Sequence, residues 1–154
     1  MEVDVVNKII AAFDAYNSND PNTETVNGKV VPKELVYAQR MSKRLDAYDP
    51  EAPVHLQLAA RCQHIGRWEI ARTEYPMDRT GYLKWRTVLK KHHAKIVDTI
   101  LTDHGVAESE RKKVTNMVLK ANMKTDKDCQ TLEDVVCLVF LEFYIEDFAQ
   151  KHDD

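Results

Sequence analysis

The chain has 154 residues, of which 44% are hydrophobic and 31% are charged, and its net charge is −3 at neutral pH. This length and composition are typical of one globular domain with its own core, so we expect residues 1–154 to form a single domain. The acidic balance argues against a broad nucleic-acid-binding surface. With four Gly and five Pro, the composition favours an all-α fold over a β-sandwich or barrel.

No apolar run reaches the length of a membrane-spanning helix, and the N-terminal residues lack the basic start of a secretory signal. Three cysteines are present, with no CxxC pair. Cys62 and Cys137 lie in apolar runs, which predicts buried free thiols in a reducing compartment. We therefore expect a cytoplasmic protein without membrane contact.

Hydrophobic spacing predicts about six helices. The expected helices cover residues 3–16, 33–48, 55–66, 82–103, 108–121 and 129–150. Residues 17–32 are rich in Asn, Asp, Thr, Pro and Gly, which predicts a loop with a tight turn at Asn27–Gly28. The centre of the last helix is apolar nearly all round, so we expect it to be the most buried segment.

The stretch HLQLAARCQHIGRWEIAR, residues 55–72, begins as an apolar helix and ends in a polar cluster. Gly66 is expected to end the helix, because glycine adopts the backbone conformations that close helices. This arrangement delivers imidazole, amide and guanidinium groups together at one helix end. It therefore predicts a functional site there.

His64, His93 and Asp134 are the candidate catalytic residues and metal ligands. Mixed imidazole and carboxylate ligation suits a divalent transition metal such as iron, manganese or zinc. The three residues lie on different expected helices and show none of the usual metal-binding spacings. The alternative, structural interpretation is that His64 caps its helix and that Asp134 stabilises the start of the last helix.

A second cluster, between residues 61 and 91, combines basic and aromatic side chains. Arginine binds phosphate and carboxylate through paired donors, and flat rings stack on bases or sugars. We therefore expect an anionic, phosphorylated small-molecule ligand, although the arginines can instead pair with acids such as Glu69 and Glu74. The residues assigned to ligand binding are Arg67, Arg72, Tyr75, Asp78, Arg79 and Lys90.

Two long strings, QHIGRWEIARTEYPMDRTGYLKWRTVLKKHHA (63–94) and KTDKDCQTLEDVVCLVFLEFY (124–144), resemble an uncharacterised domain family found in bacteria and fungi. The resemblance covers nearly the whole chain and implies no assigned activity. Some members carry labels similar to glutamyl-tRNA synthetase, but none of the catalytic synthetase motifs is present here.

Three shorter strings, VYAQRMSKRL (36–45), AARCQHIGRW (59–68) and LEDVVCLVFL (132–141), resemble helices of the histidine-aspartate (HD) phosphohydrolase superfamily. That resemblance implies an HD-like helical bundle in which His and Asp side chains hold a metal. Gln39 and Gln63 stand where the family has its two His, and His64 stands where it has an Asp, while Asp134 matches in type. Neutral amides are poor ligands for a divalent cation.

Three functions follow from these patterns. The first is an HD-like hydrolase of a phosphorylated or nucleotide-like small molecule, in which His64, His93 and Asp134 hold a metal or exchange protons. The second is a degenerate, non-catalytic HD fold that binds an anionic ligand. The third is a tRNA-linked or protein-binding accessory module, for which RNA is a disfavoured partner because the chain is acidic.

Overall fold

The computed structural model describes residues 1–121 and 126–151, and within them the fold is α-helical with one small β-hairpin. The predicted all-α class is therefore confirmed. The loop expected between the last two predicted helices lies partly outside the described residues. The elements are α1 (Val3–Asn17), β1 (Thr23–Val26), β2 (Lys29–Pro32), α2 (Lys33–Tyr48), α3 (Val54–Arg61), the 3-10 helices η1 (Arg67–Glu69) and η2 (Arg72–Glu74), α4 (Arg79–Asp103), α5 (Glu108–Val118), α6 (Lys127–Phe143) and α7 (Ile145–Lys151).

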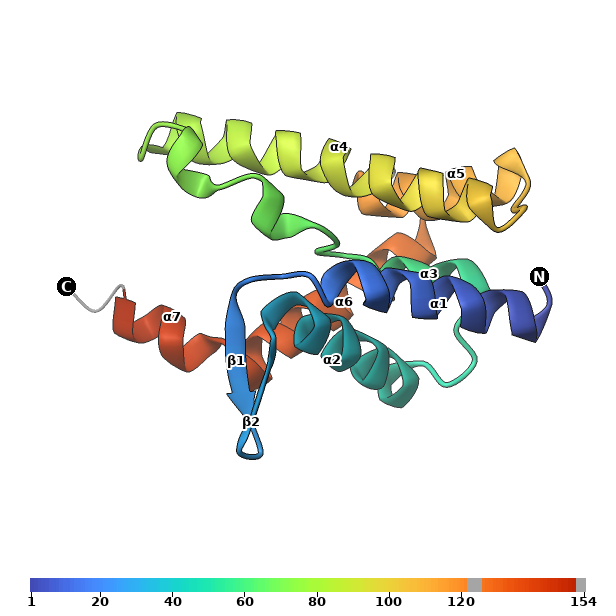
Figure 1. Ribbon diagram of the computed structural model, residues 1–154, viewed down its shortest axis with the longest axis horizontal. Coiled ribbons are helices and arrows are strands. Elements are labelled where there is room, and N and C mark those ends of the chain that lie inside the picture. The colour runs from blue at the N-terminus through green and yellow to red at the C-terminus, as the bar shows by residue number, and fades with distance from the viewer. Residues whose placement is uncertain (122–125, 152–154) are drawn as a thin grey trace.

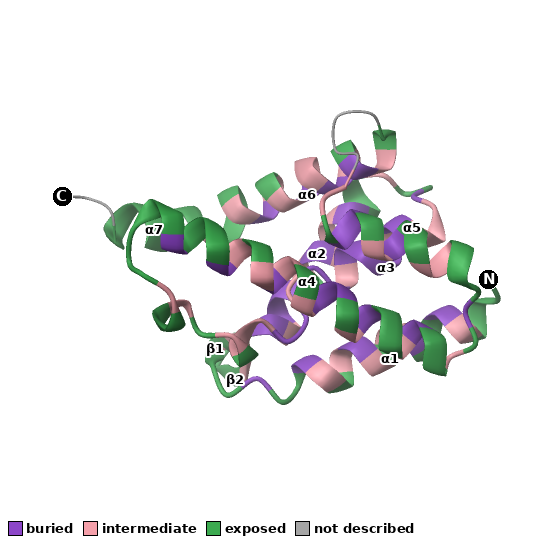
Figure 2. Cartoon of the chain, turned by 90° about the horizontal axis from the view of Figure 1, so that it is seen from above, coloured by how far each residue is buried: buried purple, intermediate pink, exposed green. Residues whose placement is uncertain are grey.

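The helices are arranged in two layers, with α4 and α5 on one side and α1, α2 and α6 on the other (Figure 1). Helix α3 lies between them, since it contacts α1, α2, α5 and α6. The side chains of Leu56, Leu58, Ala59 and Ala60 on α3 are all 0% exposed. Small residues at this position let the neighbouring helices approach closely, so α3 forms the centre of the core. Figure 2 shows the buried residues gathered around it.

The last predicted helix differs from the expectation in two ways. It breaks at Tyr144 into α6 and the short α7, and it is not the most buried segment. Only one face of α6 packs against α2 and α3, so Leu141 is 53% exposed and Cys137 is exposed. The prediction that Cys137 is buried was therefore wrong, whereas the prediction for Cys62 is confirmed.

The segment predicted as a loop contains an antiparallel hairpin, in which β1 pairs with β2 and Val26 lies opposite Lys29. The predicted turn is confirmed, because Asn27 and Gly28 both have positive φ, at 51° and 79°. Two consecutive residues with positive φ give the turn whose twist matches that of a hairpin. The strands were missed because they are only four residues long.

Helix α4 begins three residues before its predicted start. The Asp78 carboxylate accepts a hydrogen bond from the Gly81 backbone N–H at 2.7 Å and caps the helix. A Cβ atom at position 81 would lie 1.9 Å from the Pro76 carbonyl oxygen, so the loop that enters α4 needs glycine there. Among the described residues, no helix combines the length and the apolar character needed to cross a lipid bilayer.

Candidate functional site

A cavity of about 110 Å³ lies where α2, α4, α6, the end of α5 and the turn after α3 meet. We call it the central pocket. Its walls combine cationic, imidazole and apolar side chains with a single carboxylate. The pocket is lined by Tyr37, Gln63, His64, Arg67, Arg86, Leu89, Lys90, His93, Val118, Lys120, Glu133 and Val136.

The turn after α3 places the first of these groups. Helix α3 ends at Arg61, and Gly66 then adopts a left-handed conformation with φ of 67°. The predicted helix stop at Gly66 is therefore displaced, since the regular helix ends earlier and glycine closes the following turn. The Gln63 side-chain amide donates to the Ala59 carbonyl at 2.9 Å, which satisfies one free carbonyl at the helix end. Its Oε1 atom is left to accept from Lys120 at 2.8 Å.

His64 lies between a buried acid and an arginine. Its Nε2 atom is 3.1 Å from Arg67 Nη1, and its Nδ1 atom is 3.2 Å from Glu34 Oε1. A guanidinium can only donate, so Nε2 accepts and the proton of the neutral ring is on Nδ1, facing Glu34. The Tyr37 ring stacks on the imidazole with centroids 3.8 Å apart, which fixes its plane.

Burial and the nearby cations lower the pKa of His64 well below its usual value. Arg67, Arg86 and Lys120 are among the charges responsible. Burial also raises the pKa of Glu34, although Arg67 opposes that change. At neutral pH His64 is therefore an uncharged base whose tautomer is fixed by its neighbours.

His93 on α4 is held in the same tautomer by a different partner. Its Nδ1 atom lies 2.6 Å from the Ile65 backbone carbonyl, which can only accept, so Nδ1 carries the proton. Burial, followed by the unfavourable electrostatic interaction that two protonated imidazoles would have, lowers the pKa of His93 to about 3. The two imidazole centroids are 6.3 Å apart. The central pocket thus contains two neutral imidazoles.

Lys120 enters the pocket from a strained backbone position. The Ala121 N–H donates to the Asn116 carbonyl at 2.9 Å, and the Lys120 N–H donates to the Met117 carbonyl at 3.2 Å. These bonds form a Schellman motif, whose left-handed residue is usually glycine. Lys120 occupies it with φ of 61°. Its ammonium group bonds Gln63 and Glu133, and burial lowers its pKa while Glu133 opposes that change.

The charges around the pocket are unequal. Arg67, Arg86, Lys90 and Lys120 line it, whereas Glu133 is the only carboxylate among its lining residues and is already paired with Lys120. Cationic groups partly withdrawn from water form strong hydrogen bonds with an anion. The pocket can therefore bind an anionic group.

The pocket residues do not fit a resident divalent cation. Both imidazoles have their Nδ1–H held by an acceptor, as in many metal-binding histidines. However, the Glu34 carboxylate accepts from His64 Nδ1, and Glu133, the carboxylate that lines the pocket, is bound to Lys120. Four cationic side chains also line the pocket. Within residues 1–121 and 126–151, no three His, Cys, Asp or Glu side chains converge as ligands.

Asp134, the third predicted ligand, lies outside the central pocket. Its carboxylate accepts from Tyr48 at 2.9 Å and from Gln130 at 3.0 Å. Neighbouring residues on a helix point about 100° apart, and α6 directs Glu133 rather than Asp134 into the pocket. The structure therefore brings His64 and His93 together but does not add Asp134 to them.

The predicted ligand-binding residues divide into two groups. Arg67 and Lys90 line the central pocket, whereas Arg72, Tyr75, Asp78 and Arg79 belong to the loop before α4 and to its start. Arg79 precedes Lys90 by 11 residues on α4, which is about 16 Å along a helix axis.

The guanidinium of Arg72 donates to the carbonyls of this loop, Tyr75, Pro76 and Asp78. Tyr75 lines a separate shallow hollow on the outer side of α4.

Tyr37, Arg86 and Lys120 line the pocket but were not among the predicted site residues. Glu34, which bonds His64, was not among them either. Glu34 and Tyr37 fall at i and i+3 on α2, a spacing that places them on one helix face. Arg86, Lys90 and His93 fall at i, i+4 and i+7 on α4, which also places them on one helix face. The sequence contains no comparable signal for Lys120. Its position depends on a left-handed helix end, which glycine normally indicates, and lysine stands there instead.

The fold and the pocket define an all-α domain with a cation-lined cavity built around two neutral histidines. Residues 7–154 match the family model described as a domain of unknown function, DUF4202, so the chain belongs to this family. The predicted membership of an uncharacterised family is thereby confirmed. No curated protein and no solved structure matches the chain. The HD-like architecture stays a prediction, and nothing here supports a link to glutamyl-tRNA synthetase.

The strain at Lys120 can be measured by comparing two substitutions. Lys120→Gly and Lys120→Met both remove the ammonium group, but only glycine relieves the left-handed backbone. We expect the glycine variant to be more stable than the methionine variant by about 1 kcal/mol, measured by urea unfolding. Equal free energies of unfolding would show that the position is not strained.

The buried imidazole of His93 predicts a pH dependence of stability. Its pKa is about 3 in the folded protein and 6.5 in the unfolded chain, so between these values the unfolded chain binds the extra proton. The contribution of His93 to stability should therefore rise with pH through this window, by up to about 2 kcal/mol between pH 5 and pH 8.

The matched variant is His93→Asn, whose side-chain amide can still donate to the Ile65 carbonyl but does not titrate. We expect urea unfolding of this variant to lose the His93 contribution, so its stability should change less between pH 5 and pH 8. An unchanged pH profile would contradict the assignment.

Proposed function

We propose that the protein binds a phosphorylated small molecule in the central pocket. The observation that carries this proposal is the convergence of Arg67, Arg86, Lys90 and Lys120 on one cavity with a single, already paired carboxylate. The arginines offer paired N–H donors to phosphate oxygens, and the lysines add point charges. We propose a cytoplasmic location, where the free thiols would stay reduced.

An anion would change the hydrogen bonds of the pocket in a defined way. Arg67 now donates to His64 Nε2, and Lys120 bonds Gln63 and Glu133. A bound phosphate competes for both cations because it carries more charge than these partners. Once Arg67 turns to the phosphate, the lone pair of His64 Nε2 faces the ligand.

A second candidate function is hydrolysis of the bound phosphoester, and the Glu34–His64 pair favours it. In this scheme Nε2 of His64 takes a proton from water while the water oxygen attacks phosphorus and the ester oxygen leaves. Glu34 accepts the Nδ1–H bond and stabilises the imidazolium that forms. The anion also neutralises the cations that lower the pKa of His64, so the ring becomes more basic when the ligand is bound.

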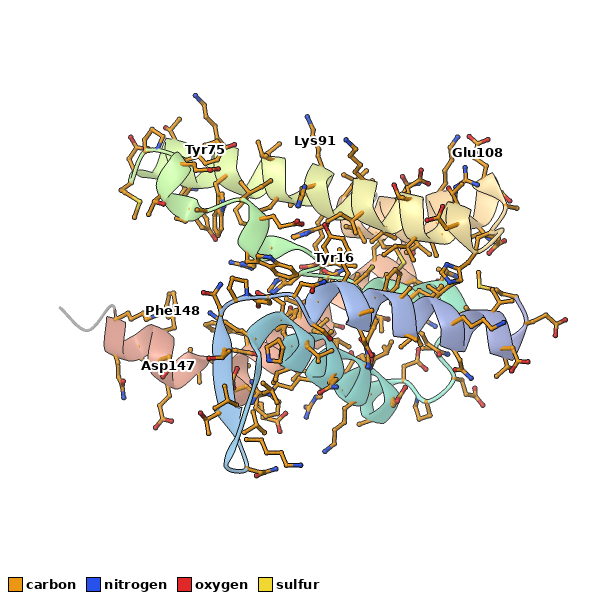
Figure 3. The ribbon with its side chains drawn as sticks, in the orientation of Figure 1. Tyr16, Tyr75, Lys91, Glu108, Asp147 and Phe148 are labelled. Carbon is orange, nitrogen blue, oxygen red and sulfur yellow. The ribbon has the colours of Figure 1, made fainter. Side chains whose placement is uncertain are left out.

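The binding proposal is tested by two neighbouring lysines on α4. Lys90 lines the central pocket, whereas Lys91 is exposed and projects from the outer side of the helix (Figure 3). We expect Lys90→Met to weaken the binding of inorganic phosphate or pyrophosphate about tenfold, the loss of one charged hydrogen bond. Lys91→Met should leave the affinity unchanged. Calorimetric titration measures both, and equal effects of the two substitutions would contradict the proposal.

The hydrolysis proposal is tested with p-nitrophenyl phosphate as a chromogenic phosphoester. If the wild-type protein turns it over, His64→Asn should lower kcat at least a hundredfold, the usual contribution of a general base. The affinity for phosphate should change only a few-fold. His104→Asn, which alters a histidine that bonds its own helix at Ile100, is the control. Full activity of the His64 variant would remove His64 from the reaction.

The third function, a tRNA-linked or protein-binding module, is supported by no contact of the pocket residues and stays an alternative. RNA binding would show a steep loss of affinity with salt. Phosphate binding in the central pocket would instead be weakened by Lys90→Met.

A further inference from the structure

A wide groove of about 830 Å³ is lined by residues of β1, α4, α6, α7 and the segment before α4. Figure 1 shows β1, α7 and the segment before α4 at the same end of the molecule. The walls of the groove are rich in aromatic side chains. They include Tyr82 and Trp85 on α4, Phe140 and Phe143 on α6, and Phe148 on α7. Figure 3 shows Phe148 on the side of α7 that faces the η2–α4 segment. We call this the aromatic groove.

The aromatic groove and the central pocket both share lining residues with a third cavity. This cavity has a volume of about 260 Å³ and shares His64 and Arg67 with the central pocket. The same cavity shares Lys33, Phe140 and Tyr144 with the groove. A ligand held by its phosphate near Arg67 would therefore extend toward the aromatic side chains.

Two arginines connect the charged and aromatic parts of this surface. The Arg67 guanidinium lies 5.1 Å from the centroid of the Trp85 ring. Arg72 lies 6.0 Å from the same ring and 5.8 Å from the ring of Tyr82. Stacked arginine and aromatic side chains form flat platforms on which another planar ring can stack.

Three of the aromatic residues of the groove are accessible, whereas Trp85 is 7% exposed. Tyr82 is 42% exposed, Phe143 is 41% exposed and Phe148 is 48% exposed. Exposed large apolar side chains that gather on one surface are typical of binding sites. Here they lie near a pocket for which we propose an anionic ligand, and the two features together indicate the chemistry of the occupant.

We propose that the aromatic groove binds a planar ring of the same ligand whose phosphate occupies the central pocket. The ligand would then be a phosphorylated compound with a flat, heteroaromatic group, of which a nucleoside monophosphate is the simplest common example. This inference rests on the proposed phosphate binding and adds the second half of the ligand. The polar groups of Lys33, Glu24 and Lys151, which also line the groove, can bond the edge of such a ring.

The experiment compares ligands with and without the ring. Ribose 5-phosphate supplies the phosphate and sugar, and adenosine and uridine 5′-monophosphates add a base. The chain has two tryptophans, so Trp68→Phe leaves Trp85, a groove residue, as the single indole reporter. Titrations follow its fluorescence, and calorimetry gives the affinities.

We expect at least one of the two nucleotides to bind about tenfold more tightly than ribose 5-phosphate, as stacking of one base provides. The nucleotide should also quench the fluorescence of Trp85. Phe143→Ala should remove this tenfold gain and leave the affinity for ribose 5-phosphate unchanged. Leu141→Ala is the matched control, since Leu141 is also exposed on α6 but lies outside the groove residues.

The outcomes separate the two proposals. Equal affinities for ribose 5-phosphate and both nucleotides, with unchanged Trp85 fluorescence, would overturn the ring site and leave phosphate binding intact. Failure of all three compounds and of inorganic phosphate to bind would overturn the phosphate pocket and the ring site together. An equal loss of nucleotide affinity in Phe143→Ala and Leu141→Ala would also contradict the groove.

Discussion

The hydrogen bond between His93 and the Ile65 carbonyl is the contact on which the site depends. It joins α4, in one layer, to the turn that follows the central helix α3. The same turn is held from α1, because the Asn17 side-chain oxygen accepts from the Gly66 N–H at 3.3 Å. His64 and Arg67 flank these two anchored residues, so their directions follow from the packing of three helices. A rigid turn of this kind can present functional groups accurately without a long loop.

The pocket contains unfavourable electrostatic interactions that the packing of the helices does not explain. Burial and nearby cations keep both His64 and His93 neutral, and four cationic side chains lie near one another with one carboxylate between them. The cationic side chains repel one another, and a bound anion would reduce this repulsion. Groups with strongly shifted pKa values gather at functional sites more often than elsewhere, and this cluster is the main reason to place the function here.

Much of the fold followed from local patterns in the sequence. The bounds predicted for α2 agree with the structure, and the Asn27–Gly28 turn is present, because helix periodicity and turn chemistry act over a few residues. The prediction that α6 is the most buried segment was wrong, because an apolar sequence does not show which neighbouring elements cover each face of the helix. The residues that line the central pocket could be predicted only in part. His64 and His93 share the pocket, but the choice between Glu133 and Asp134 depended on the rotation of α6, which only tertiary packing determines.

The unusual helix end at position 120 has a consequence for comparing members of the family. Glycine is the residue that this backbone favours, so the lysine at this position opposes the local conformational preference. A relative with glycine at the corresponding position would keep the same helix end and lose a charge from the cavity. The identity of this one residue could therefore sort family members into those that keep the full set of cations and those whose pocket has changed its use.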